Sequence, residues 1–270
     1  MNKIFAIIQA RMDSKRFPKK VLKKIDEKTM LNYVVIQTLA SKSIDEVIIS
    51  TTSSSEDIPI VDFCKKNSLK YYRGSKNDVL DRYYKTAKKF RCDPVVRISS
   101  DCPLIDPNVI DKVITKFLNN PFDYVSNNIE HKDGTWTNSL CKFPQGMVVE
   151  VSSFKALTKA WKMAKKPSER EHVFPFIQFN PDIFSVSNIR NKKDLSHIRC
   201  TVDRRNDLKF IQNLVSHLDN KKIIHISDIE KISKKFPSIL TINNNYNFDE
   251  GYQKSLKQDR QNKFNKKYEK

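Results

Sequence analysis

Short β-branched runs alternate with longer amphipathic segments through the first half of this chain. The runs predict strands at 3–9, 46–51, 70–73, 95–99 and 123–126. The amphipathic segments predict helices at 29–41, 56–67, 78–90 and 107–119. Such alternation is typical of parallel strands with helices on both faces of the sheet. The sequence therefore predicts an α/β fold with a mostly parallel central sheet.

The second half is less regular, and we expect it to extend the same sheet. It predicts a loop at 134–146, strands at 147–151, 183–189 and 197–202, and helices at 153–165, 169–179 and 204–218. A length of 270 residues is near the upper size for one hydrophobic core. We expect one domain over residues 1–240 and a basic tail over residues 241–270, whose end is a frayed or docked helix because it has few apolar residues.

Glycine is scarce, and this excludes two large classes of nucleotide-binding protein. The chain has 4 glycines, whereas average usage is roughly 7%. Neither a G-x-G-x-x-G fingerprint nor a Walker loop can be written from Gly74, Gly134, Gly146 and Gly251. Dinucleotide oxidoreductases and P-loop kinases are therefore excluded, and any bound phosphate must be held by basic side chains.

The formal net charge of +19 is compatible with nucleic acid, anionic lipid or phosphorylated small molecules as partners. A coding bias towards lysine explains the charge equally well. The 5 cysteines show no C-x-x-C spacing, so we expect reduced thiols rather than a zinc cluster or disulfides. Apolar runs are far shorter than the roughly 20 residues of a membrane helix, and polar residues interrupt the N-terminal run. We expect a soluble cytoplasmic protein with no membrane partner.

A cationic loop follows the first predicted strand. Five basic side chains lie within ten residues, between Arg11 and Lys20. In an α/β sheet, ligands bind at the carboxyl ends of the strands, where this loop lies. The loop suits a polyphosphate, and the alternative is a solvated basic loop.

Two aspartates follow buried-type runs, Asp101 after 95–100 and Asp203 after 199–202. Two carboxylates at one sheet edge make an oxygen site for Mg²⁺, which bridges nucleotide phosphates in transfer chemistry. Alternatively, Asp101 caps a turn before Pro103, and Asp203 caps the helix that follows it.

Five ordered motifs resemble the cytidylyltransferases that activate acidic sugars, the enzymes that make CMP-sialic acid and CMP-Kdo, and in particular their spore-coat polysaccharide subgroup. The resemblance extends over residues 3–256 and rests on the segments 8–22, 73–83, 100–106, 169–173 and 194–203. It implies a three-layer α/β/α nucleotidyltransferase fold, Rossmann-like and of the GT-A type.

The resemblance also implies roles for individual residues. Arg11 and Lys20 resemble the catalytic pair that grips the triphosphate. Asp101 and Asp203 resemble the magnesium ligands. The nucleotide is expected to contact Ala10, Arg11, Lys20, Arg73, Asp78, Ser99 and Asp101. The acceptor is expected to contact Gln145, Glu169, Arg170 and His172, although the last three also fit a salt-bridged helix start.

The expected activity is Mg²⁺-dependent transfer of CMP from CTP to a small acidic acceptor, with release of pyrophosphate. The acceptor is a nonulosonate, a Kdo-like sugar or a phosphonate, and the product serves cell-surface glycan synthesis. The resemblance further implies a homodimer, formed through residues 127–142 and the stretch around Pro167. The alternative is a non-catalytic binder of nucleic acid or another anionic partner, for which the sequence shows no motif.

The chain departs from the family pattern at four positions. Asp13 and Lys19 stand where the family loop has glycines, and Gln145 and Val148 replace acidic residues. Asp13 tolerates a left-handed backbone, whereas Lys19 requires an ordinary backbone angle or some strain. The loss of two carboxylates implies a different acceptor, a missing metal contact or weakened catalysis.

Overall fold

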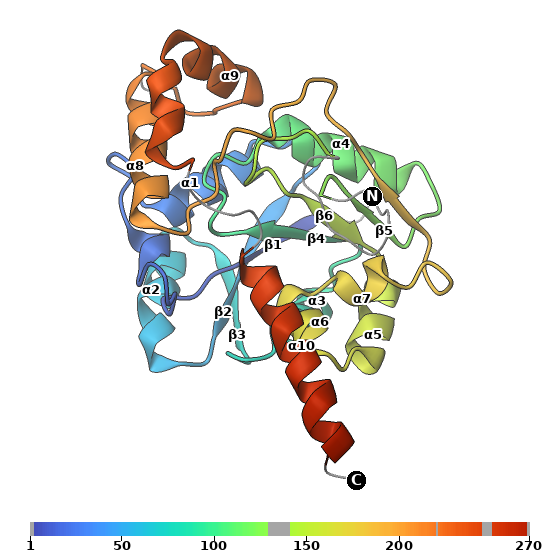
Figure 1. Cartoon of the computed structure of the whole chain (residues 1–270). Helices are drawn as coiled ribbons and strands as arrows, with labels where there is room; N and C mark the ends of the chain where they lie inside the picture. Colours follow the sequence, from blue (N-terminus) through green and yellow to red (C-terminus); the bar gives the residue numbers. More distant parts are fainter. Residues whose placement is uncertain (1–2, 129–140, 220, 245–249, 269–270) are drawn as a thin grey trace.

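The structure is a computed structural model that describes residues 3–128, 141–219, 221–244 and 250–268 (Figure 1). Its centre is a seven-stranded sheet in the order β3-β2-β1-β4-β6-β5-β7. The strands are β1 (Phe5–Gln9), β2 (Glu46–Thr52), β3 (Lys70–Gly74), β4 (Val95–Ser99), β5 (Tyr124–Ser126), β6 (Glu150–Ser152) and β7 (Val186–Asn188). Neighbours run parallel except at β6, which is antiparallel to both β4 and β5.

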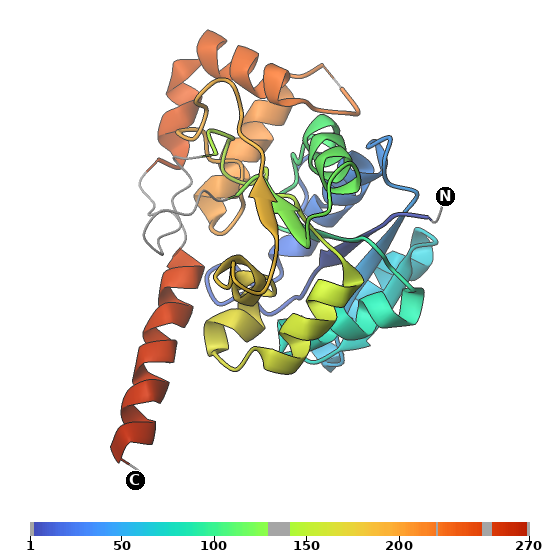
Figure 2. The ribbon, with the colours of Figure 1, turned by 90° about the vertical axis from the view of Figure 1, so that its right-hand side faces the viewer.

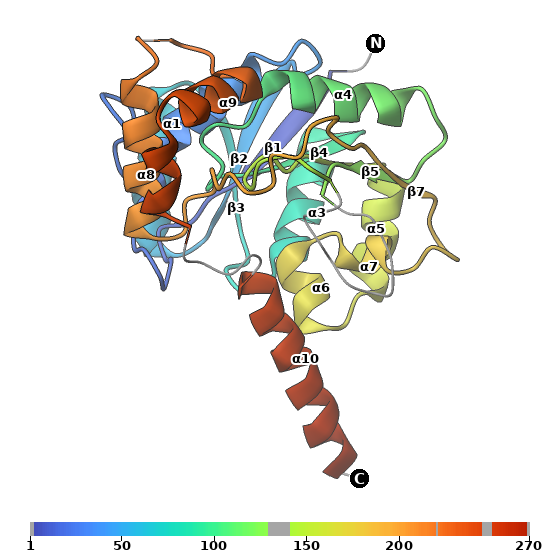
Figure 3. The same ribbon diagram turned by 45° about the horizontal axis from the view of Figure 1, so that its top comes forward.

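Helices cover both faces of this sheet, which confirms the expected three-layer fold (Figures 1 and 3). Successive strand side chains point to opposite faces, so Ile8 and Ile49 join one apolar core while Ile7 and Ile48 join the other. The first core includes α1 (Met30–Leu39), α2 (Ile58–Lys66), α4 (Pro107–Leu118), α8 (Arg205–Ser216) and α9 (Ile226–Lys235). The second face carries α3 (Val79–Phe90), α5 (Phe154–Met163), α6 (Pro167–His172) and α7 (Pro175–Gln178).

The helix starts follow from local capping chemistry. Thr29, Asp78 and Ser153 each accept a hydrogen bond from the backbone N–H three residues later, at the starts of α1, α3 and α5. Asp106 caps α4 in the same way through the N–H of Asn108, with Pro107 at the first helical position. The strands and helices predicted for the first half are confirmed.

Three predictions for the second half are wrong. Residues 197–202 form no strand and have one isolated bridge, between Gln145 and Arg199, because their N–H groups bond to successive unrelated loops. The predicted helix 169–179 breaks into α6 and α7 at Val173, whose φ is 75°, just before Pro175. β6 begins only at Glu150, because the Asn127 side chain bonds to the backbone of Met147 and Val149.

The last helix, α10 (Glu250–Tyr268), runs away from the body of the molecule (Figure 2). Its first part docks on α6 through Tyr252, Ser255 and Asp259, which are buried. The Asp259 carboxylate accepts hydrogen bonds from the Ser168 backbone N–H at 3.0 Å and hydroxyl at 2.5 Å. Short 3-10 helices, η1 (Lys20–Leu22), η2 (Ser55–Asp57) and η4 (Pro237–Ile242), complete the described elements.

Three further expectations concern the cysteines, membrane-spanning helices and the segments between residues 127 and 146. All 5 cysteines are free and buried, as expected. Within the described ranges, no helix combines the length and apolar character that crossing a bilayer requires. Most of the predicted loop 134–146 and of the expected dimer segment 127–142 lies outside the described residues.

Candidate active site

The loop after β1 is held by a buried carboxylate. Asp57 in η2 is 2% exposed and accepts hydrogen bonds from the backbone N–H of Met12 at 2.6 Å and of Thr52 at 3.3 Å. The backbone N–H of Ala10 donates to Ser50 at the end of β2. The Arg11 side chain is exposed, and no residue that the structure describes forms a hydrogen bond or ion pair with it. Arg11 is therefore free to bind an anionic ligand.

The two departures from glycine in this loop have different consequences. Lys19 adopts φ 60°, in the left-handed region. Of the two alternatives for Lys19, an ordinary backbone angle or backbone strain, the structure therefore shows strain. Asp13 lies outside that region. Its carboxylate pairs with Lys76 at 2.9 Å, and this partner lowers the pKa of Asp13.

Lys20 lies at the centre of the site. Its Nζ is 3.2 Å from Asp101, 3.0 Å from Asp203 and 2.7 Å from the carbonyl oxygen of Val202. Burial opposes the charge of this ammonium group, but the two carboxylates outweigh it and raise the pKa of Lys20. Burial likewise opposes the charge of Asp203, yet Lys20 and Arg16 lower the pKa of Asp203 to about 2. The predicted metal pair is thus brought together around one cation.

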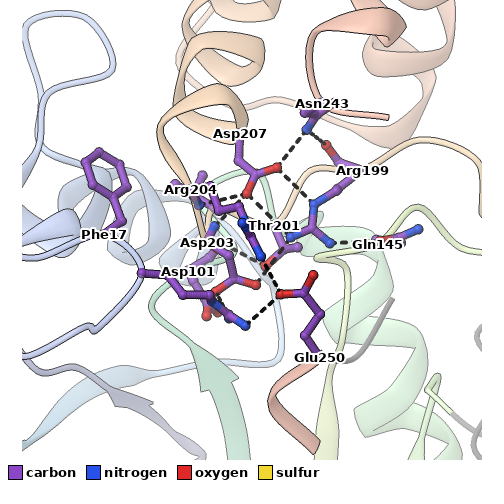
Figure 4. A network of polar contacts seen from close by, with 12 residues as sticks. Phe17, Asp101, Gln145, Arg199, Thr201, Asp203, Arg204, Asp207, Asn243 and Glu250 are labelled. Carbon is purple, nitrogen blue, oxygen red and sulfur yellow. Dashed lines mark hydrogen bonds and ion pairs between the residues drawn. The ribbon is translucent and has the colours of Figure 1, made fainter. Parts of the chain in front are cut away.

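Asp203 reaches this position because its segment lies against the end of β4. The backbone N–H of Val202 donates to the carbonyl of Asp101 at 2.8 Å. Asp207, which is fully buried, accepts from the N–H groups of Asp203 and Arg204 at 2.9 Å each and from Arg199 Nε at 2.9 Å (Figure 4). Asp207 therefore caps α8, and the alternative in which Asp203 is the cap is wrong.

Within the part of the chain that the structure describes, no backbone N–H donates to the carboxylate of Asp101. It contacts Lys20 and the thiol of Cys102, at 3.2 Å and 3.6 Å. The turn-cap alternative for Asp101 therefore fails too, and both carboxylates face the site.

Two further basic residues join the same network, and the sequence had not assigned them. Arg16 contacts Asp203 at 2.7 Å and Glu250 at 3.3 Å. Arg204 contacts Glu250 at 2.8 Å (Figure 4). The density of cations in the loop pointed to Arg16, but nothing local connects it with Glu250, which follows 234 residues later.

Two of the residues predicted to contact the nucleotide, Arg73 and Asp78, hold neighbouring backbone in place. Arg73 donates to the carbonyls of Thr52, Ser53 and Ser54 at 3.1, 2.8 and 2.9 Å. It thereby closes the loop after β2. Asp78 caps α3, and Ser99 ends β4 two residues before Asp101.

Arg82, on α3, is 2% exposed and donates to the carbonyl of Ser75 at 2.5 Å. Burial, together with the nearby charge of Arg11, lowers the pKa of Arg82 to about 10.

The four predicted acceptor residues do not converge. The side chain of Gln145 contacts Arg199 at 3.2 Å, in the part of the site where Asp203 lies. Glu169 accepts the N–H groups of Lys165 and Lys166 at the start of its own helix, which is the alternative foreseen for it. Arg170 pairs with Asp78 and donates to the carbonyl of Trp161. Acceptor contacts for these three stay predictions.

His172 lines a polar pocket, which the sequence had not foreseen as a unit. The lining residues come from β4, β6, the segment after β5, α6, α7 and α10, and are Arg97, Asn128, Glu150, His172, Pro175, Gln178 and Tyr252. Arg97 and Glu150 form a buried ion pair, and Glu150 also accepts the hydroxyl of Tyr124 at 2.8 Å. The sequence feature that could have indicated this pocket is a charged residue within each of two apolar strands.

Contacts through β1, β4 and α10 connect the polar pocket with the charged part of the site. Arg97 Nε donates to the side chain of Gln9, the residue that ends β1, at 3.4 Å. Arg97 lies on β4, which leads to Asp101. Tyr252 lies on α10, two residues after Glu250, the partner of Arg16. The site therefore has a charged part around Lys20 and a polar part around Arg97 on the same edge of the sheet.

Comparison with known proteins gives the family. A cytidylyltransferase profile matches residues 5–258. An uncharacterized protein of Methanocaldococcus jannaschii is 38% identical over 245 residues, covering 90% of this chain and 95% of that protein. The spore coat polysaccharide biosynthesis protein SpsF of Bacillus subtilis is 25% identical, with 89% and 98% covered. A cytidylyltransferase structure from Leptospira borgpetersenii is 30% identical with a TM-score of 0.81, covering 91% of this chain and 98% of that one. This chain belongs to the cytidylyltransferase family.

Proposed function

We propose that the protein transfers CMP from CTP to a small acidic acceptor, with magnesium as cofactor and pyrophosphate as the leaving group. Acceptors of this kind are nonulosonates, Kdo-like sugars and phosphonates. The observation that carries the proposal is the convergence of Asp101 and Asp203 on Lys20, in the same loop as Arg11, which has no ion-pair partner among the described residues. The naming of the Bacillus subtilis relative for spore coat polysaccharide biosynthesis supports a role in surface glycans.

The donor set fits a magnesium ion that is shared with the nucleotide. Asp101 and Asp203 each lie within 3.2 Å of one cationic atom, so their oxygens face a common point. The described residues contain no cluster of three or more metal-binding side chains, so the protein alone does not complete a metal site. Mg²⁺ commonly binds through one or two carboxylates plus substrate phosphates. When bound, it would neutralise charge on the phosphates.

The basic residues of the site have two sets of partners. In the structure, Lys20 and Arg16 neutralise Asp203, and Lys20 also neutralises Asp101. A triphosphate offers both cations new anionic partners, and a divalent cation offers the same to the two carboxylates. Every charge is therefore paired both in the protein alone and with the triphosphate and divalent cation bound. The exchange of partners thus has a small electrostatic cost.

Arg11, Arg16 and Lys20 would then hold and orient the triphosphate. Fixed positive charge at the α-phosphate stabilises the charge that develops there while the acceptor oxygen attacks in line. The polar pocket would hold the acceptor, since it shares β4 and α10 with the charged part of the site. Rate enhancement would come from positioning and from electrostatic stabilisation.

The test is pyrophosphate release from CTP with a panel of N-acetylneuraminate, 3-deoxy-manno-octulosonate and small phosphonates, with and without magnesium. We expect turnover of CTP with at least one acceptor, and no turnover when EDTA replaces magnesium. ATP, GTP and UTP serve as controls for the base. Absence of turnover with every acceptor, together with no heat of CTP binding in calorimetry, would refute the proposal.

A further inference from the structure

Ser255 on α10 contacts three polar groups at once. Its Oγ lies 3.1 Å from His172 Nε2, 2.9 Å from a carboxylate oxygen of Glu171 and 3.2 Å from the carbonyl oxygen of Gly251. The hydroxyl is buried, with Ser255 1% exposed. Ser255 thus links α10 to the one predicted acceptor residue that lines the polar pocket.

The number of protons available determines how these groups bond. A carboxylate and a carbonyl oxygen only accept hydrogen bonds, and a serine hydroxyl has one proton to donate. The Ser255 proton is therefore directed to Glu171 or to Gly251. His172 Nε2 must then be the donor to Ser255, which places the imidazole proton on Nε2.

The other ring nitrogen of His172 is left as an acceptor. Burial lowers the pKa of His172 to about 4, with Arg97 adding to the effect against the opposing charges of Glu171 and Asp259. The ring is neutral at pH 7, so Nδ1 carries a lone pair. None of the residues described in the structure bonds to Nδ1.

The charges of the polar pocket do not favour an anion. Arg97 is the cation among its described lining residues, and it already forms a buried ion pair with Glu150. Glu150 also accepts hydrogen bonds from Tyr124 at 2.8 Å and from Gln178 at 3.4 Å. A carboxylate entering here would compete with Glu150 for a single guanidinium group and would face the lone pair of His172 Nδ1.

We infer that Ser255 is a positioning residue that holds His172 as its Nε2–H tautomer, so that Nδ1 accepts a hydrogen bond from a neutral group of the acceptor, a sugar hydroxyl or an acylamino N–H. This inference rests on the proposed acceptor-binding role of the polar pocket. It places the acid group of the acceptor outside this pocket, towards the cationic loop. Specificity would then come from the neutral part of the sugar, and α10 would be required for it.

The first experiment reads the tautomer directly in the full-length protein. Long-range ¹H–¹⁵N spectra distinguish the two tautomers of each of the 5 histidines, and His172→Gln assigns the signal. We expect the Nε2–H pattern for His172 at pH 7, and a mixture of tautomers in Ser255→Ala. Ser255→Thr, which keeps the hydroxyl, should restore the wild-type pattern. Ser233→Ala is the matched control, because Ser233 is buried and its hydroxyl has no hydrogen-bond partner among the residues that the structure describes.

The second experiment measures recognition. We expect Ser255→Ala to raise the KM for the best acceptor of the panel about tenfold, the size of one hydrogen bond, with kcat and the KM for CTP unchanged. In wild type and Ser233→Ala, but not in Ser255→Ala, adding that acceptor should shift the His172 Nδ1 resonance. If the enzyme turns over none of the panel, its members are titrated individually in the same spectra.

Three results would overturn the inference. They are an Nδ1–H tautomer in the wild type, an unchanged tautomer and KM in Ser255→Ala, or a His172 resonance that no panel member shifts. The tautomer is read without nucleotide or acceptor, so it reports on Ser255 even where CTP turnover fails. Failure of the proposed function and failure of this inference are therefore distinguishable.

Discussion

Asp203 is the residue whose replacement best separates a chemical role from a structural one. Its carboxylate contacts Lys20 at 3.0 Å and Arg16 at 2.7 Å, while Asp207 performs the capping of α8. Asp203→Asn keeps the size of the side chain but removes the charge that binds a hard cation. We expect turnover to fall on the order of a hundredfold, because one transition-state charge contact is worth about 3 kcal/mol. CTP affinity should fall much less, since Arg11 and Lys20 remain.

Pyrophosphate release and calorimetry with CTP provide the two readouts for Asp203→Asn. Asp228→Asn is the matched control, because Asp228, on α9, pairs with Lys221, and none of the site contacts given above involves α9. Parental turnover with parental magnesium dependence in Asp203→Asn would show that the metal assignment is wrong.

His172 makes stability depend on pH. Its pKa is lowered from 6.5 to about 4, so the unfolded chain binds the proton more tightly than the folded protein does. Folding stability should therefore fall as the pH drops from 6.5 towards 4, by roughly 2 kcal/mol at pH 5 relative to pH 7. Arg97 disfavours the charged ring, whereas Glu171 and Asp259 oppose this effect.

Urea unfolding of wild type and His172→Gln at pH 7 and pH 5 measures this contribution. The loss of unfolding free energy on acidification should be smaller in His172→Gln, because the surface carboxylates contribute equally to both proteins. Equal losses in the two proteins would mean that His172 is readily protonated in the fold.

At the scale of elements, one glycine permits the close approach of two loops. Gly146 has φ +91°, and a Cβ there would lie 2.6 Å from the backbone nitrogen of Thr201 and 2.8 Å from the carbonyl carbon of Cys200. We expect Gly146→Ala to destabilise the protein by roughly 2 kcal/mol and to displace the segment that carries Asp203. Turnover should fall with stability. Gly251→Ala is the control, since a Cβ added there would meet no atom of the described residues within 4 Å, and thermal unfolding monitors both variants.

The outer part of α10 is expected to be dispensable. Asp259 is the last buried residue among the side chains of this helix that the structure describes, and Arg260 is exposed. A chain ending at Asp259 should therefore retain CTP turnover. Removal of the whole helix from Glu250 onwards should abolish acceptor use, because it removes Tyr252 from the polar pocket and Ser255 from its contact with His172. Activity assays on the two truncations test this, and a large loss in the shorter truncation would contradict the assignment of residues 260–270 as external to the site.

Over the whole molecule, the positive charge is concentrated outside the network around Lys20. Within that network Arg16, Lys20, Arg199 and Arg204 face four carboxylates, so its formal charge is zero. The net charge of +19 therefore belongs to the remaining surface. A surface of this sign raises the local concentration of an anionic nucleotide, a long-range effect that salt weakens.

The homodimer that the resemblance implies stays a prediction. Sedimentation velocity at micromolar concentration should give twice the chain mass of 31.6 kDa. A species of one chain mass at that concentration would contradict the dimer. Part of the expected interface, within residues 127–142, lies outside the described residues, so solution mass is the appropriate measurement.

The sequence by itself determined the α/β class, the first-half strands and helices, and the identity of the central residues. Periodicity is a local property, so the alternation of β1 to α4 was readable without coordinates. Ordered motifs likewise pointed to Arg11, Lys20, Asp101 and Asp203.

Only the tertiary structure decided how distant segments meet. Residues 197–202 have the pattern of a strand because Ile198, Cys200 and Val202 are buried, but they bond to loops, and this places Asp203 beside Asp101. Glu250 joins Arg16, and Ser255 joins His172, across 234 and 83 residues. Such contacts depend on packing of whole elements, which no local pattern encodes, so the polar pocket and the role of α10 emerged only from the fold.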